Sequence, residues 1–169
     1  MSSRTPFGTP SRCLGAPVPE PLFDDLYREL ILDHYRRPRH RGALANPTVH
    51  VEGMNPVCGD EVRIDMAIVG ETVREIAFDG QGCSISQASA SMLATQVYGK
   101  SIEATRTLSS AFKAMLVDGA LPTALLGDLE ALEGVAKFPV RVKCALLPWN
   151  VLEQGLNEAA SKTKELSIG

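Results

Sequence analysis

The stretch NPVCGDEV, residues 55–62, places a cysteine and an aspartate two positions apart. Cys58 and Asp60 carry metal-binding side chains, and Gly59 between them permits backbone angles that other residues avoid. A thiolate and a carboxylate in one turning segment indicate a metal site. The alternative is a polar turn that leads into a strand, and this stretch alone favours neither.

Cys83 is expected to lie beside Cys58, because a β-hairpin separates them. Residues 62–69 and 72–79 alternate apolar and polar side chains on either side of a Gly-containing turn. A hairpin brings its two ends together, so the cysteines that flank it should be neighbours. Cys83 also precedes a helix that starts at Ser84, where the helix dipole favours a thiolate. A small buried residue at a strand–helix junction is the alternative.

Cys144 has a different setting, because cations flank it. Arg141 and Lys143 lie within three positions of it, and nearby cations lower the pKa of a thiol. A cysteine of this kind is otherwise most often a buried, inert thiol. Cys13 lies in a segment that has no core to hold a ligand geometry, and we interpret it as incidental.

Three thiols and one carboxylate form a plausible donor set for a tetrahedral metal site: Cys58, Asp60, Cys83 and Cys144. Sulfur ligands suit zinc or iron–sulfur chemistry. The harder, weaker carboxylate would make the site more exchangeable than a structural site with four cysteines. The spacing matches none of the short paired zinc patterns, so spacing alone is weak evidence.

The composition is that of an ordinary soluble protein. The chain has 169 residues, a length that is enough for one domain with a sizeable core. Of these residues, 44% are hydrophobic and 22% are charged. The net charge of −3 argues against a nucleic-acid partner, and the basic residues between positions 36 and 41 are too local to reverse this. No apolar run approaches the ~20 residues of a membrane helix.

The first 20 residues differ from the rest of the chain. They hold six Pro or Gly residues and no continuous apolar core, so we predict a disordered tail over 1–20 and a single domain over 21–169. A transit peptide is the alternative, but the tail has only two arginines. Without a secretory signal the expected compartment is the cytoplasm, where thiols stay reduced.

The coarse pattern predicts an α+β fold. An amphipathic helix follows Pro21 and stops at Pro38, and a loop-rich segment over 38–61 precedes the hairpin. Later helices are expected from Ser84 to Gly99, after Ser101, around 128–137, and around Cys144, where Pro148 must lie near the helix start or kink it. Because the strands come before most helices, we predict a small antiparallel sheet covered on one face by helices.

Four blocks of sequence resemble one known family. They are LYRELILDHYRRPRHRG, NPVCGDEV, GQGCSIS followed by ASASM, and RVKCALLPW. In this order they look like the IscU/NifU-like iron–sulfur cluster assembly proteins, over residues 22–160. The resemblance implies a SufE/NifU-like α+β fold.

Two features resemble the SufU branch of that family. Members that assemble clusters usually carry a histidine immediately before the third of the matching cysteines, where this chain has Lys143. The segment LGDLEALEGVAKFP fills the place of the SufU insertion. The SufU branch is zinc-dependent and transfers sulfur in the SUF pathway.

The resemblance implies a zinc-dependent sulfur acceptor in iron–sulfur cluster assembly. It assigns zinc to Cys58, Asp60, Cys83 and Cys144, sulfur acceptance as a persulfide to Cys58, and contact with the partner to Arg141. That partner would be a SufS-type pyridoxal-phosphate cysteine desulfurase. On docking, a histidine of the partner would replace Cys58 on zinc, and the freed thiolate would take the terminal sulfur. A downstream SUF scaffold would receive it.

Two other functions stay open at this stage. One is a scaffold that builds a [2Fe–2S] cluster on the three cysteines and Asp60. The other is a non-catalytic interaction module in which zinc only stabilises the fold. A monomer is the simplest oligomeric state, although the helix after Ser84, rich in Ala and Ser, offers a surface for a second copy in a weak dimer.

Overall fold

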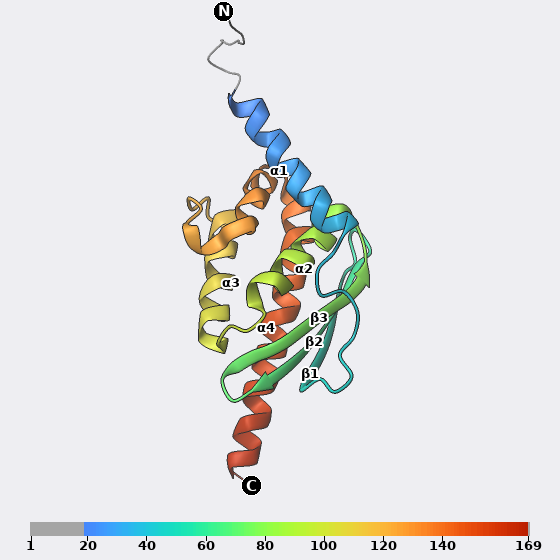
Figure 1. Cartoon of the computed structure of the whole chain (residues 1–169), viewed down its shortest axis with the longest axis vertical. Coiled ribbons are helices and arrows are strands. Elements are labelled where there is room, and N and C mark those ends of the chain that lie inside the picture. Colours follow the sequence, from blue (N-terminus) through green and yellow to red (C-terminus); the bar gives the residue numbers. More distant parts are fainter. Residues whose placement is uncertain (1–18, 169) are drawn as a thin grey trace, which may run out of the picture.

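The computed structural model describes residues 19–168, with side chains over 27–162. Helices stand on one side of a twisted antiparallel sheet, as Figure 1 shows. Helix α1, Pro19–Arg36, begins two residues before the expected start at Pro21. The predicted tail lies outside the described residues except for its last two positions, which belong to α1. The predicted α+β class is confirmed.

The sheet has three strands in the order β1-β2-β3. The predicted hairpin is formed by β2, Asp60–Val69, and β3, Thr72–Gln81. Ile64 pairs with Phe78 across the two strands, and both side chains are buried. Gly70 in the connecting turn has a φ of 62°, a conformation that glycine adopts without strain.

Strand β1, Val49–Asn55, lies in the segment that we predicted to be loop, so that prediction was wrong. Val49 and Val51 are buried while the residues that follow each of them are exposed, which is the alternation of a half-buried strand. Gly53 occurs here because a Cβ atom at this position would overlap Val151 of the last helix. Its role is close packing, not a turn.

Two helices follow the sheet at the expected places. Helix α2 spans Ser84–Val97 and helix α3 spans Ile102–Val117. The predicted cap of α3 is confirmed, because the Ser101 side chain accepts the N–H of Ala104 at 3.0 Å. Thus α3 begins directly after the turn that closes α2.

The C-terminal part of the chain differs from the prediction in two places. A 3₁₀ segment, η1, spans Ala124–Lys137 and is interrupted at Gly127, whereas we predicted a short helix around 128–137. Helix α4 spans Pro139–Ile168, and Pro148 lies in its interior, not near its start. Trp149 of α4 stacks on Phe112 of α3 at a centroid distance of 4.9 Å, in the middle of the core.

Helix α2 is the central helix of the molecule (Figure 1). It contacts α1, β3, η1 and α4, and ten of its fourteen residues are buried. Its Ala and Ser residues therefore pack within the chain, and the suggested dimer surface on this helix was wrong. Within residues 19–168, no helix has the length and apolar content to cross a membrane.

Candidate metal centre

Asp60 is the centre of the candidate site. Its Oδ2 atom lies 3.0 Å from Cys58 Sγ and 3.7 Å from Cys83 Sγ, and its Oδ1 accepts the backbone N–H of Cys83 at 2.9 Å. The hairpin creates this arrangement, because Glu61 at the start of β2 pairs with Gln81 at the end of β3. The residues that flank the open end of the hairpin are thereby brought together.

A tight turn presents Cys58 to solvent. The N–H of Gly59 bonds to the Asn55 carbonyl at 2.7 Å, and the Asn55 side chain accepts the N–H of Val57 at 3.1 Å. Gly59 has a φ of 75°, which a residue with a side chain adopts only with strain. The glycine between Cys58 and Asp60 thus allows the chain to turn so that both side chains face one point.

Cys144 reaches the site from α4. Its Sγ lies 3.5 Å from Cys58 Sγ and 3.6 Å from the carbonyl oxygen of Val140, one turn earlier in the helix. Donor atoms of Cys58, Asp60 and Cys144 all lie within 4.8 Å of one another. Cys83 lies outside this closest group and contacts it through Asp60. The structure therefore brings all four predicted residues to one place.

The burial of the site controls its electrostatics. Burial raises the pKa of the Cys144 thiol, and hydrogen bonds to Asp60 and Cys58 raise it further. We predicted that Arg141 and Lys143 lower this pKa, which was wrong, because the burial of Cys144 dominates and both cations are exposed. Burial also opposes the ionisation of Asp60, but hydrogen bonds from Cys58 and from the Cys83 backbone outweigh it and hold the Asp60 pKa below its ordinary value.

The donors present fit a zinc ion. An ionised, buried carboxylate faces three free thiols, a set with the sulfur-rich character that zinc prefers. A bound cation would reverse the effect of burial on Cys144 by stabilising its thiolate. The carboxylate supplies one hard ligand among soft ones, as the sequence indicated.

The three thiols differ in exposure. Cys58 is exposed, Cys83 is half-buried and Cys144 is buried. Asp60 is also buried, at 2% exposure. Cys58 is thus the residue of the set that a macromolecular partner meets at the surface, whereas Asp60 and Cys144 are held inside the molecule.

Arg141 lies one turn before Cys144 on α4 and is exposed. It lines a groove of about 850 Å³ that α1, η1 and the start of α4 enclose. Ser84, the neighbour of Cys83, lines the same groove, so the groove begins beside the thiols. Arg141 is therefore placed to contact a protein that approaches the site, although it contacts none of the four donors in a described hydrogen bond or ion pair.

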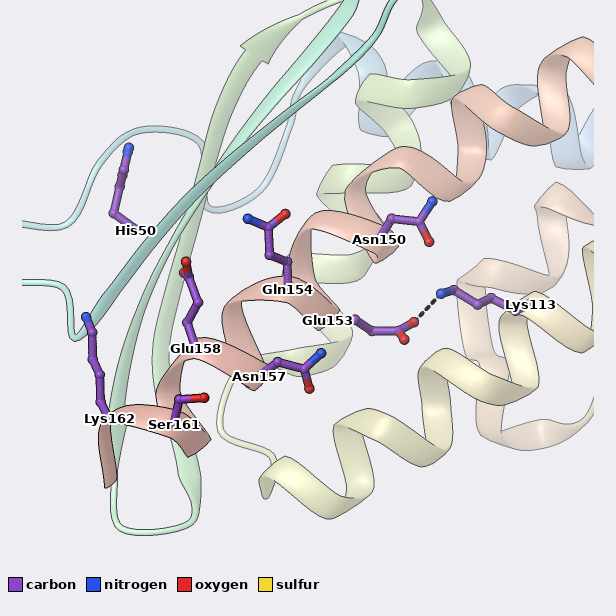
Figure 2. A pocket seen from close by; sticks show the side chains of 9 residues that line it. All are labelled: His50, Lys113, Asn150, Glu153, Gln154, Asn157, Glu158, Ser161 and Lys162. Atoms are coloured by element: carbon purple, nitrogen blue, oxygen red, sulfur yellow. Dashed lines mark ion pairs between the residues drawn. The ribbon is translucent and has the colours of Figure 1, made fainter. Parts of the chain in front are cut away.

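A second hollow, of about 750 Å³, lies along the outer face of α4 (Figure 2). Its lining is polar and includes Asn150, Gln154 and Asn157, with an ion pair between Lys113 and Glu153. None of the three cysteines that the structure describes lines it. It offers no thiol chemistry and is separate from the candidate metal centre.

Gly82 is a site residue whose role we did not predict. A Cβ atom at this position would overlap the Asp60 carboxylate and lie 2.7 Å from Ser86 Oγ. Glycine therefore leaves room for the carboxylate that Cys58 and Cys83 contact. The motif GQGC carried a signal, since a second glycine directly before a cysteine indicates close approach by another group.

Known proteins share this architecture. Residues 26–163 match the family of the NifU-like N-terminal domain. The chain belongs to this family. The family prediction is confirmed, and the match includes every residue of the candidate centre.

Relatives of both functional types are similar to the chain. It is 46% identical over 134 residues to the zinc-dependent sulfurtransferase SufU of Bacillus subtilis, and the aligned region covers 79% of this chain and 90% of that protein. It is 39% identical over 137 residues to the iron–sulfur cluster assembly scaffold protein IscU of Streptococcus pyogenes, covering 80% and 86%. The higher identity to SufU supports the predicted branch.

Solved structures agree with the fold. FiSufU of Fervidobacterium islandicum superposes with a TM-score of 0.73 at 33% identity, over 76% of this chain and 94% of that one. The N-terminal part of a NifU-like protein of Brucella abortus gives a TM-score of 0.76 at 24% identity, over 83% and 99%, and this likeness concerns the fold alone.

Proposed function

We propose that this protein is a zinc-dependent sulfur acceptor in SUF-type iron–sulfur cluster assembly. The observation that carries the proposal is the unequal exposure of the donors: Cys58 is exposed, whereas Asp60 and Cys144 are buried. One cysteine thus lies at the surface, where a partner can approach it, while Asp60 and Cys144 are held in place inside the molecule. The similarity to a zinc-dependent sulfurtransferase supports the same function.

Zinc would be held by Cys58, Asp60, Cys83 and Cys144. When bound, it keeps thiols deprotonated at neutral pH and supplies no redox chemistry. Asp60 positions the Cys58 sulfur by direct contact at 3.0 Å, and the backbone N–H of Cys83 orients that carboxylate. The turn at Gly59 gives Cys58 its access to solvent.

The sulfur donor in this proposal is the persulfide of a SufS-type pyridoxal-phosphate cysteine desulfurase. The Cys58 thiolate attacks the terminal sulfur of the donor's persulfide. The S–S bond of the donor breaks, the donor cysteine leaves as a thiolate, and Cys58 carries the persulfide. Arg141, exposed beside the groove that starts at the thiols, contacts the desulfurase. Sulfur then passes to a downstream scaffold, and we expect these steps in the cytoplasm.

The test is the rate of alanine release from cysteine by the desulfurase. We expect strong stimulation by the zinc-loaded protein, a weaker effect of the zinc-stripped protein, and none by Cys58→Ala. Arg141→Ala should raise the concentration needed for half-maximal stimulation, while Lys137→Ala, another exposed cation on the groove, serves as its control. Full stimulation by Cys58→Ala would contradict the proposal.

A scaffold function is the second candidate, and the similarity to IscU proteins favours it. The [2Fe–2S] cluster would then be the product assembled on the three cysteines and Asp60. Lys143 stands where cluster-assembling members usually have a histidine, which argues against this candidate. Anaerobic incubation with iron and a sulfur source distinguishes the two, because a scaffold would hold a stable, coloured cluster.

A further inference from the structure

The backbone of α4 is interrupted at a candidate metal ligand. Pro148 lies inside α4 and has no N–H, so the carbonyl of Cys144, four residues earlier, lacks its donor within the helix. The proline ring also crowds that carbonyl. The helical turn that carries Cys144 therefore has one backbone hydrogen bond fewer than a regular helical turn, and its own helix holds it less firmly.

A buried serine of α2 contacts this turn. The Ser89 hydroxyl donates to the carbonyl oxygen of Ala145 at 2.7 Å, and the indole N–H of Trp149 donates to the same hydroxyl at 3.2 Å. All three residues have no exposed surface. Because water does not reach these groups, the serine hydroxyl and the indole N–H depend on this network for their hydrogen bonds, and the Ala145 carbonyl gains an acceptor bond from outside its own helix.

The serine links two helices that each hold a thiol of the site. Cys83 is the N-cap of α2, six residues before Ser89, and Cys144 immediately precedes Ala145 in α4. Trp149 is itself fixed by stacking on Phe112. The Ser89 hydroxyl lies in a rigid part of the core. It therefore holds the turn that carries Cys144 in a fixed position relative to the start of α2, where Cys83 lies.

We propose that Ser89 is a positioning residue for the metal centre. Its hydroxyl, oriented by the Trp149 indole, holds the neighbouring carbonyl of Ala145, and so restrains from α2 the turn that Pro148 loosens and fixes the place of the Cys144 thiol. The inference rests on the metal site of the proposed function and extends it to a side chain outside the four donors.

The first test compares Ser89→Ala with Ser91→Ala. Ser91 lies on the same helix and is equally buried, but its hydroxyl contacts His34 Nδ1 of α1 at 2.8 Å and is directed away from α4. Zinc affinity is measured by competition with a chromophoric chelator. We expect Ser89→Ala to weaken zinc binding by about 10-fold or more, the range for a residue that orients a ligand, and Ser91→Ala to leave it unchanged. The absorption bands of bound Co²⁺ should shift only in Ser89→Ala.

The second test repairs the helix. Pro148→Ala restores an N–H opposite the Cys144 carbonyl, and alanine favours the helix. In this background Ser89→Ala should cost much less zinc affinity than in the parent protein, because the turn no longer depends on the serine. The double variant also provides the comparison if Ser89→Ala alone fails to fold.

Two results would overturn the inference. One is an equal loss of zinc affinity in Ser89→Ala and Ser91→Ala, and the other is an equal loss from Ser89→Ala with and without Pro148→Ala. A parent protein that binds no zinc would overturn the metal site as well. Sulfur transfer that is absent while the zinc results hold would contradict the proposed function alone.

Discussion

Asp60 shows how one side chain organises the candidate centre. It is 2% exposed, yet it accepts the Cys58 thiol and the Cys83 backbone N–H, and these bonds keep its pKa low against the effect of burial. The sequence indicated this aspartate because it stands two positions from a cysteine. The space that it needs is provided by Gly82, whose importance only the packing reveals.

A substitution at Gly82 tests this space. In Gly82→Ala the new methyl group would displace the Asp60 carboxylate, so we expect zinc affinity to fall by about 10- to 100-fold. Competition with a chelator measures the change. Gly134→Ala is the control, because a Cβ atom there meets nothing within 4 Å. Equal zinc affinity in the two variants would contradict the role of Gly82.

At the scale of elements, local sequence patterns predicted the helices and strands whose stabilising contacts lie between residues close in sequence. The hairpin was predictable because its alternation and its turn are local, and it placed Cys83 beside Cys58. Strand β1 was missed because a proline on each side and Gly53 suggested a loop. Gly53 is instead required by contact with Val151, about 100 residues away in sequence, and no local pattern shows that contact.

The cap of α3 gives a prediction about one element. Ser101→Ala removes the side chain that accepts the N–H of Ala104, so we expect the free energy of unfolding to fall by about 1 kcal/mol. Urea unfolding measures it. Ser110→Ala, on the exposed side of the same helix, should change stability little. A cap variant as stable as this control would show that α3 does not depend on Ser101.

Buried His34 ties α1 to α2 and η1, and this gives a prediction about pH. Its ring contacts Ser91 at 2.8 Å and Asp128 at 3.4 Å. Burial, with the charge of Arg39, lowers the His34 pKa despite the opposing effect of Asp128 and Asp33. The neutral ring is thus favoured in the folded state, so its stability contribution is complete above the ordinary pKa of about 6.5 and is lost as pH falls below it.

The variant His34→Gln isolates this contribution. The parent should lose stability more steeply than the variant between pH 6.5 and the lower pKa of the folded state, as followed by urea unfolding at several pH values. Both proteins keep the same candidate metal centre, so the difference between them reports on His34. Parallel pH profiles would show that His34 does not titrate in the folding reaction.

For the whole molecule, the candidate centre joins three elements. Cys58 and Asp60 come from the turn into β2, Cys83 from the start of α2, and Cys144 from α4. The position of Cys144 could not be derived from the sequence, because it depends on how α4 packs against α2 and the sheet. Its residue type made it a candidate donor, the family resemblance assigned it to zinc, and the geometry places it 3.5 Å from Cys58.

Metal removal should therefore destabilise the fold. Free zinc at a thousand times its dissociation constant adds about 4 kcal/mol to the free energy of unfolding. A chelator should lower the Tm of the parent, and it should lower the Tm of Asp60→Ala much less. Unchanged Tm values in the parent would mean that no metal links these three elements.

The location of the transferred sulfur tests the central claim most directly. The protein is incubated with the desulfurase and cysteine, persulfides are trapped by alkylation, and the peptides that carry Cys58, Cys83 and Cys144 are identified by mass spectrometry. The account predicts the additional sulfur on Cys58 and none on the protein in Cys58→Ala. Sulfur on Cys83 or Cys144 in the parent, or an unchanged amount in Cys58→Ala, would contradict it.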